Sequence, residues 1–192
     1  MNISEYFNAE FDEHAKTTAA TRATLGGNFA RLVAVAVESI HSGGKILLFG
    51  NGGSAADCQH IAAELTIRFI ADRPAIAAIA LTTDSSALTA GGNDLGFDEI
   101  FSRQLEALAR PGDLALGIST SGNSENVIRG LKKARNLDVV AAGFGGKSGG
   151  FMAELADPYL VVPSQTTARI QEMHIILGHM LCGALERELG LV

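Results

Sequence analysis

Five short apolar segments recur along the chain and constrain its fold more than any other feature. They cover residues 45–49, 76–81, 113–118, 139–144 and 159–162. Successive positions in each segment are apolar, so we expect strands that are buried on both faces. A Gly, Ser, Thr or Asp and then a helical pattern follow each segment. This alternation predicts an α/β fold, a flavodoxin-like three-layer sandwich with a five-stranded parallel sheet.

Helical patterns begin and end the chain. Apolar residues recur at helical spacing through the first forty residues, and Gly26-Gly27 predicts a break between two helical segments. A last helix is expected over about residues 167–188. We therefore expect all 192 residues to form a single domain, with an N-terminal helical extension at 1–42 and an α/β core at 43–192.

The composition narrows the class of protein. Hydrophobic residues make up 47% of the chain and Trp is absent, so we expect a core of Ala, Ile, Leu and Val. The 15 Lys and Arg against 21 Asp and Glu give a formal charge of −6, which disfavours nucleic-acid binding. No signal-peptide pattern is present, and the most apolar stretch, 75–81, is far shorter than the roughly 20 residues that span a bilayer. With two cysteines that form no framework pattern, the sequence predicts a soluble cytoplasmic protein with no membrane segment.

A glycine-rich loop, Gly50-Asn51-Gly52-Gly53-Ser54, follows the first apolar segment and precedes a helix expected at 55–70. It fits the relaxed G-x-G-x-x-G/A dinucleotide fingerprint. That fingerprint also expects an acidic residue about 20 positions later, at the end of the next strand. Asp72 is near that distance but precedes the next strand, so nucleotide binding is disfavoured. The remaining interpretation is a turn whose amides and Ser54 hydroxyl contact a sugar or a phosphate.

A run of hydroxyl side chains, Ser119-Thr120-Ser121-Gly122-Asn123-Ser124, follows the third apolar segment and precedes a helix expected to start near Glu125. Helix capping by Ser124 or Asn123 would explain one or two of these residues. Capping does not explain several hydroxyls at the carboxyl end of a strand, where open α/β sheets bind ligands. The sequence therefore favours a phosphate site made of hydroxyls and free amides at a helix N-terminus.

Two groups of metal-capable side chains lie on predicted helices. His60 and Glu64 have the i, i+4 spacing that places both on one helix face, beside the glycine-rich loop. Gln171, His174 and His179 interrupt the apolar last helix, where buried polar groups need partners. Each group has a simpler explanation when taken alone: a surface i, i+4 pair, or a core histidine with satisfied hydrogen bonds.

Taken together, these imidazole and carboxylate groups favour a zinc site, with other divalent ions of the same series as alternatives. The last helix poses a geometric difficulty, because Gln171 and His179 are separated by about 12 Å along the axis at 1.5 Å per residue. They can share an ion only if their side chains lean together or the helix is irregular. His174, one turn from Gln171, is the local competitor.

The combination of motifs resembles the phosphoheptose isomerase family of the sugar-isomerase (SIS) domain superfamily. The motifs are G-N-G-G-S-A-A-D from Gly50, H-x-x-x-E from His60, G-G-N-D from Gly91, I-S-T-S-G-N-S from Ile118, and R-I-Q-E-M-H from Arg169 together with His179. The resemblance extends over essentially the whole chain, which implies a single SIS domain. The serine loop alone would indicate only an SIS domain, whereas the set of His60, Glu64, Gln171 and His179 is more specific.

The resemblance implies an isomerase that converts sedoheptulose 7-phosphate to D-glycero-D-manno-heptose 7-phosphate, the entry step to the heptose units of bacterial lipopolysaccharide and related glycans. It implies one zinc ion per subunit, held by His60, Glu64, Gln171 and His179, in a homotetramer with active sites between subunits. The expected substrate and phosphate contacts are Asn51, Gly52, Gly53, Ser54, Glu64, Asn93, Asp94, Ser119, Thr120, Ser121, Ser124 and Gln171. The sequence departs from the family at Ala168, where relatives often carry an acidic residue.

The residue types suit this chemistry. Aldose–ketose isomerisation moves a proton between neighbouring carbons through an enediol, so it requires a base and an acid or electrophile. We expect Glu64 to be the base and His179 the acid. Zinc would polarise the carbonyl of the sugar.

Two other functions compete with this interpretation. Some SIS-domain relatives are non-catalytic tetramers that bind the replication initiator protein, but they have lost metal-site residues, whereas Glu64 and His179 are both present here. A sugar-phosphate-sensing regulator would need a DNA-binding module, for which the chain has neither the length nor the charge. Oligomer formation has separate support, since Phe7 and Phe11 have few apolar neighbours to cover them.

Overall fold

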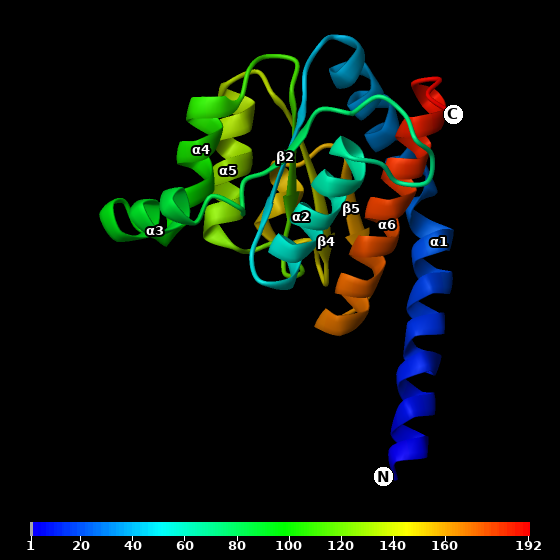
Figure 1. The fold of residues 1–192 in the computed structure, drawn as a ribbon. Helices are drawn as coiled ribbons and strands as arrows, with labels where there is room; N and C mark the ends of the chain where they lie inside the picture. Colours follow the sequence, from blue (N-terminus) through cyan, green and yellow to red (C-terminus); the bar gives the residue numbers. More distant parts are fainter. Residues whose placement is uncertain (1) are drawn as a thin grey trace.

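All five predicted strands pair in one parallel sheet in the computed structural model, which describes residues 2–192 (Figure 1). The strands are β1 (Ile46–Gly50), β2 (Ala78–Ala80), β3 (Leu114–Ile118), β4 (Val140–Gly146) and β5 (Tyr159–Val162). Their order across the sheet is β2-β1-β3-β4-β5, and every neighbouring pair is parallel. This is the flavodoxin-like order, so the predicted fold class is confirmed.

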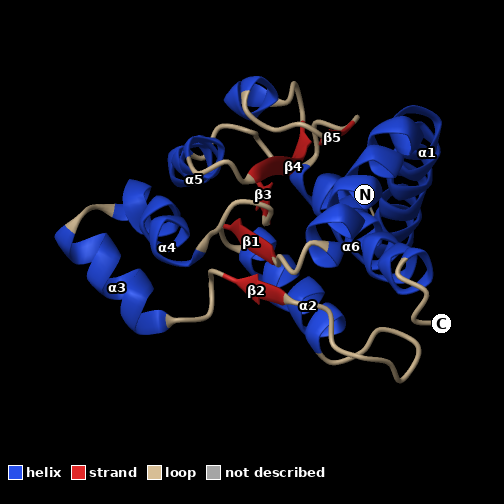
Figure 2. Ribbon diagram, turned by 90° about the horizontal axis from the view of Figure 1, so that it is seen from above, coloured by secondary structure: helices blue, strands red, loops and turns tan. Residues whose placement is uncertain are grey.

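Helices cover both faces of the sheet (Figure 2). They are α1 (Ile3–His41), α2 (Gly53–Thr66), α3 (Ser85–Asp94), α4 (Ile100–Leu108), α5 (Glu125–Asn136) and α6 (Thr167–Glu188), with short 3-10 helices η1 (Phe97–Glu99) and η2 (Gly150–Glu154). Helices α1, α2 and α6 lie on one face, α4 and α5 lie on the other, and α3 is outside α4. No helix between residues 2 and 192 is both long and apolar enough to cross a membrane.

Alternation along the strands produces two separate apolar cores. Ile46 and Leu48 of β1 belong to the core beneath α1, α2 and α6. Leu47 and Phe49 belong to the core beneath α4 and α5. Because successive strand side chains point to opposite faces, a strand with a layer on each side must be apolar throughout. This explains the uninterrupted apolar segments in the sequence.

The predicted break at Gly26-Gly27 is wrong, because α1 is one continuous helix of 39 residues. Glycine in a helix interior costs about 1 kcal/mol relative to Ala, which is too little to break a helix that gains tertiary packing. Helix α1 packs along α6 and β5, and its buried side chains include Leu25 and Leu32 on either side of the glycine pair. Nothing in the described protomer explains why these two positions are glycine.

Helix α2 ends at Thr66, earlier than the predicted end at residue 70. The guanidinium of Arg73 donates hydrogen bonds to the carbonyl oxygens of Glu64 and Leu65. These carbonyls belong to the last turn of α2, whose acceptors have no intrahelical donors. A side chain nine residues away in the sequence therefore satisfies this helix end, which is an arrangement that local periodicity does not reveal.

We predict that Gly27→Ala stabilises the protein. A Cβ at Gly27 would meet no atom within 4 Å, and Ala both favours helix and restricts the unfolded chain. The free energy of unfolding should rise by about 0.5–1 kcal/mol, measured by urea unfolding at fixed protein concentration. Gly43→Ala is the matched control: that position is equally open, but its φ of +78° strains Ala, so stability should fall. Destabilisation by Gly27→Ala would contradict a continuous α1.

Candidate active site

Two histidines from helices far apart in the sequence meet at one point on the surface. The Nε2 atoms of His60 on α2 and His179 on α6 lie 2.9 Å apart. The two helices approach closely here, because a Cβ at Gly178 would lie 2.5 Å from Cδ1 of Ile61. Glu64 is one turn further along α2, and its Oε1 lies 3.5 Å from His60 Nε2. Three of the four predicted metal ligands are therefore neighbours.

Asp57 belongs to the same group and was missed by the sequence analysis. It precedes His60 by three residues, a spacing that places both on one face of α2 and could have revealed it. Its Oδ2 atom is buried and has no hydrogen-bond partner among the described residues. Burial raises the pKa of the Asp57 carboxyl, and the nearby imidazoles of His60 and His179 oppose this shift when they carry charge. An unpaired buried carboxylate oxygen next to two facing imidazoles is an arrangement that a cation would complete.

Gln171 lies against the start of α2, whereas the two histidines meet further along that helix. Its side-chain Nε2 would be 2.5 Å from a Cβ placed on Gly53, at the first residue of α2. His60 is seven residues further along α2, about 10 Å at 1.5 Å per residue. Helix α6 is continuous from Gln171 to His179, so the expected axial separation of about 12 Å between them is present. The role of Gln171 as a metal ligand stays a prediction.

The chemistry of the donor groups fits zinc, although the ligand set within one protomer is incomplete. Two imidazole nitrogens that face one another are a common part of zinc sites, and a carboxylate is a common third ligand. Among the residues described, no three His, Cys, Asp or Glu side chains are gathered closely enough to hold a metal ion. To hold a metal ion with His60 and His179, Glu64 would have to adopt a different rotamer, or a further donor would have to come from elsewhere.

His174 is a structural histidine. It is completely buried, and its Nε2 lies 2.9 Å from the carbonyl oxygen of Gly145, to which it donates. Desolvation lowers the pKa of His174 to about 4, with the bond to Gly145 opposing the shift. A neutral imidazole held against β4 is not a competitor for the group at His60 and His179.

The predicted phosphate loop brings three hydroxyls together. Ser119 Oγ lies 3.0 Å from Ser124 Oγ and 3.4 Å from Ser121 Oγ. Ser124 is the N-cap residue of α5, yet its side chain makes no capping hydrogen bond. The hydroxyl of Ser121 instead accepts a bond from the Asn123 amide. Ordinary capping therefore does not explain these serines, and their hydroxyls gather where the positive end of the α5 dipole favours an anion.

The glycine-rich loop is fixed by a pair of amides. Asn51 and Asn126 exchange two hydrogen bonds of 2.8 Å each, so the end of β1 is tied to the first turn of α5. Asn126 is buried, and its partner could not be identified from the sequence. Gly52 has a φ of +58°, a conformation that favours glycine and allows the sharp entry into α2. The two predicted anion-binding loops are therefore one connected structure.

Asn93 and Asp94 lie on neither of the helices that carry His60 and His179. They end α3, where the Asn93 amide donates to Asp94 Oδ1 at 2.6 Å. Figure 2 shows α3 on the opposite side of the sheet from α6. No residue of α3 is buried. Their contact with substrate stays a prediction.

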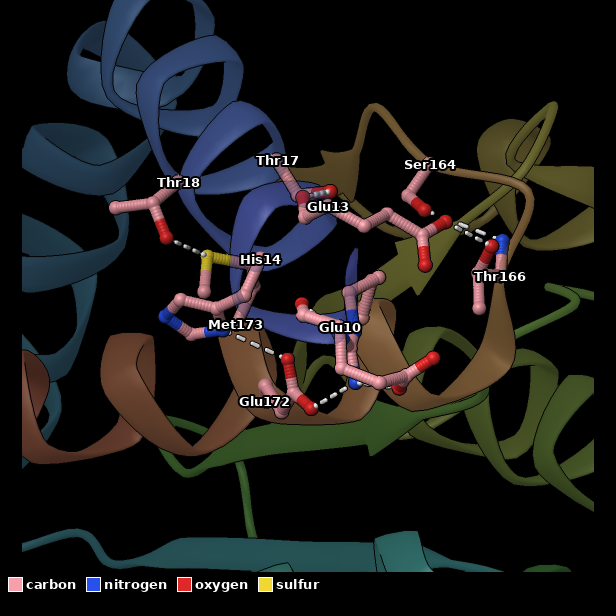
Figure 3. A network of polar contacts seen from close by, with 10 residues as sticks. Glu10, Glu13, His14, Thr17, Thr18, Ser164, Thr166, Glu172 and Met173 are labelled. Atoms are coloured by element: carbon pink, nitrogen blue, oxygen red, sulfur yellow. Dashed lines mark hydrogen bonds and ion pairs between the residues drawn. The ribbon is translucent and has the colours of Figure 1, made fainter. Parts of the chain in front are cut away.

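A polar network fixes α1 to the start of α6, next to Gln171 (Figure 3). His14 Nδ1 lies 2.7 Å from Glu172 Oε2, and Thr166 donates to Glu13 Oε1 at 2.5 Å. These contacts join residues more than 150 positions apart in the sequence. They determine the direction in which the first turns of α1 extend past the rest of the molecule (Figure 1).

Comparison with known proteins agrees with this geometry. The family model for the SIS domain matches residues 10–146. A phosphoheptose isomerase from Paramagnetospirillum magneticum is 58% identical over 97% of each chain, and one from Aquifex aeolicus is 53% identical over 92% of each chain. The chain belongs to the phosphoheptose isomerase family of SIS-domain proteins.

Solved structures of this family share the whole fold. A phosphoheptose isomerase from Neisseria gonorrhoeae, 43% identical, superposes with a TM-score of 0.91. One from Francisella tularensis, 34% identical, gives a TM-score of 0.94. Each match covers 97% of this chain and 100% of the other. The long α1 and the α6 that carries His179 are therefore parts of the common family architecture.

For this member of the phosphoheptose isomerase family, we predict that His174 makes stability depend on pH. The folded-state pKa of about 4 lies below the ordinary 6.5, so the unfolded chain binds more protons between these values. Stability should fall as the pH is lowered through this interval, by up to about 3 kcal/mol. His174→Gln keeps a donor for Gly145 and cannot titrate. Urea unfolding at pH 7 and pH 5 should show a smaller pH dependence for the variant; an unchanged dependence would contradict the assignment.

Proposed function

We propose that this chain converts sedoheptulose 7-phosphate to D-glycero-D-manno-heptose 7-phosphate, the first step in the synthesis of bacterial heptose units. The observation that carries the proposal is the convergence of His60, Glu64 and His179 from two helices. The names of the relatives support the same substrate class, a sugar phosphate. A non-catalytic role as a partner of a replication initiator would not require these three side chains to meet.

The mechanism assigns the proton transfer at the carbons to Glu64 and the proton transfer at the oxygens to His179. Glu64, at the last turn of α2, removes the proton from the carbon next to the carbonyl and returns it to the neighbouring carbon. His179 transfers the proton between the two substrate oxygens, and the ring of Phe69, stacked on it at 5.5 Å between centroids, restricts its orientation. The hydroxyls of Ser119, Ser121 and Ser124, with Thr120, hold the phosphate remote from the reacting carbons.

The same proposal includes one zinc ion per subunit. His60 and His179 would hold it, with Glu64 as a third ligand and Gln171 as a fourth. When bound, zinc would polarise the sugar carbonyl and stabilise negative charge on the substrate oxygens. Support comes from the facing imidazoles and from the unpaired Asp57 oxygen beside them.

We propose further that the working form is a homotetramer with sites between subunits. Exposed apolar side chains on the first turns of α1, including Phe7 and Phe11, indicate a surface that needs a partner. Gln171 lies against the start of α2, and Asn93 and Asp94 end α3 on the opposite side of the sheet from α6 (Figure 2), so we expect them to serve a site of a second copy. Light scattering at micromolar concentration tests this, and a stable monomer would contradict it.

The function is tested directly by incubating the purified protein with sedoheptulose 7-phosphate and detecting the aldose phosphate. We expect turnover without a chelator, loss of turnover after metal removal, and recovery when zinc is added. If the chelator does not change product formation, the isomerase activity stands and the zinc ion is excluded from the proposal. No product under any condition would overturn the proposed activity.

We predict that Glu64→Gln and His179→Asn each lower kcat by at least about 10²–10⁴-fold while the protein still assembles, because acid–base groups typically contribute that much. Since acid, base and metal act as one unit, the double variant should be little worse than the poorer single variant. His174→Gln is the control and should keep zinc and activity. If His174→Gln loses zinc while His179→Asn keeps it, the metal has been assigned to the wrong histidine.

We predict that Ser121→Ala mainly raises KM. A phosphate remote from the reacting carbons contributes binding that is similar in the ground state and the transition state, so kcat should change little. Steady-state kinetics with sedoheptulose 7-phosphate measures both constants. Ser42→Ala, at the far end of the sheet after α1, is the matched control and should leave both unchanged. If Ser121→Ala has the wild-type KM, the loop does not bind the phosphate.

A further inference from the structure

A buried ion pair lies beneath the candidate site and is not part of it. Arg73 Nε donates to Glu186 Oε1 at 2.9 Å, and the two side chains are 0% and 3% exposed. Arg73 comes from the segment between α2 and β2, and Glu186 from the last turns of α6. Charges removed from water to this extent are stable only with close partners and additional hydrogen bonds. The other partners of this pair indicate what it does.

The remaining nitrogens of Arg73 hold the end of the helix that carries Glu64. Nη2 donates to the Glu64 carbonyl oxygen at 2.8 Å, and Nη1 donates to the Leu65 carbonyl oxygen at 2.6 Å. The planar guanidinium offers these donors in a fixed arrangement, which Lys cannot reproduce. The backbone of Glu64 is thus fixed relative to Glu186, and through it to α6.

Glu186 also fixes the aromatic ring that lies against His179. Its Oε1 accepts a hydrogen bond of 3.2 Å from the Phe69 amide. The Phe69 ring stacks on the His179 ring with an interplanar angle of 25°. The ring also packs against α6 at Gly183, where a Cβ would lie 3.4 Å from it, an ordinary contact distance. The same Glu186 oxygen therefore accepts bonds from Phe69, whose ring lies against His179, and from Arg73, which holds the helix end that carries Glu64.

We infer that Arg73, Glu186 and Phe69 are positioning residues that set the separation and orientation of Glu64 and His179. The pair connects α2 to α6 beyond their closest approach, so the two helix ends cannot separate without breaking a buried charge pair. The inference rests on the proposed function for the roles of Glu64 and His179. The statement that these residues fix the spacing of α2 and α6 does not depend on the proposed function.

The first test is zinc affinity, measured on metal-stripped full-length protein by competition with a chromogenic chelator. Residues that orient metal ligands typically contribute 10–100-fold to metal affinity. We expect Arg73→Lys and Glu186→Gln to weaken zinc binding by at least about ten-fold and to lower kcat more than they raise KM. Phe69→Leu leaves the ion pair intact, so it should fold normally and still weaken zinc binding.

Asp113→Asn is the matched control. Asp113 is also buried, and its carboxylate accepts bonds from the Lys45 side chain and from the Lys45 and Arg110 amides, but it lies at the amino edge of the sheet. This variant should lower Tm and leave zinc affinity unchanged. If zinc affinity follows Tm in all variants alike, the Arg73–Glu186 pair is only structural and the inference is overturned. Wild-type zinc affinity in Arg73→Lys and Phe69→Leu would overturn it as well.

A second measurement separates this inference from the proposed function. Crystal structures of metal-free wild type and Arg73→Lys give the separation of the His60 and His179 Nε2 atoms and the position of the Glu64 backbone. We expect α2 to shift relative to α6 in the variant. If the wild type neither binds zinc nor isomerises sedoheptulose 7-phosphate, the proposed function fails, yet this comparison still decides the inference: unchanged spacing overturns it.

Discussion

The close approach of α2 and α6 is the constraint on which the candidate site depends. Both helices rest on the same face of the sheet and run in the same direction, since the start of α2 meets Gln171 and the segment after it meets Gly183. Gly178 allows this approach, because a Cβ there would lie 2.5 Å from Ile61 Cδ1 and the Ile61 side chain would have to move. A separation greater by the width of a side chain would part the two imidazoles, so a packing requirement in the core determines the chemistry at the surface.

The sheet places the other half of the site. Helix α2 follows β1 to one face and α5 follows β3 to the opposite face, although β1 and β3 are neighbours. Loops that diverge in this way leave a crevice at the carboxyl ends of the strands, where ligands of open α/β sheets bind. The amide pair between Asn51 and Asn126 crosses that point and ties the glycine loop to the serine loop. In the proposed mechanism, the anion site lies at the start of α5, which follows β3, and Glu64 lies on α2, which follows β1, whereas His179 comes from α6 after β5.

Features that depend on local pattern could be predicted from the sequence, and features that depend on distant contacts could not. The apolar segments predicted the strands, and the last helix has the expected bounds of 167–188. In both cases the buried positions recur at a regular spacing that can be recognised in the sequence. The glycine pair in α1 was misinterpreted, since packing against α6 outweighs propensity. The end of α2 and the position of Gln171 depend on Arg73 and Gly53, whose partners are distant in sequence.

The positions of Gln171 and His179 on α6 bear on the proposed oligomer. They are eight residues apart on one continuous helix, about 12 Å along its axis at 1.5 Å per residue. In the proposed oligomer, His179 would complete the site of its own protomer while Gln171 completes that of a neighbour. The contact between His14 and Glu172 then gains significance, because it fixes α1 beside Gln171. In that proposed oligomer, the His14–Glu172 contact would hold together the helix that meets the partner and the residue that enters the partner's site, so assembly and completion of the site would depend on one another.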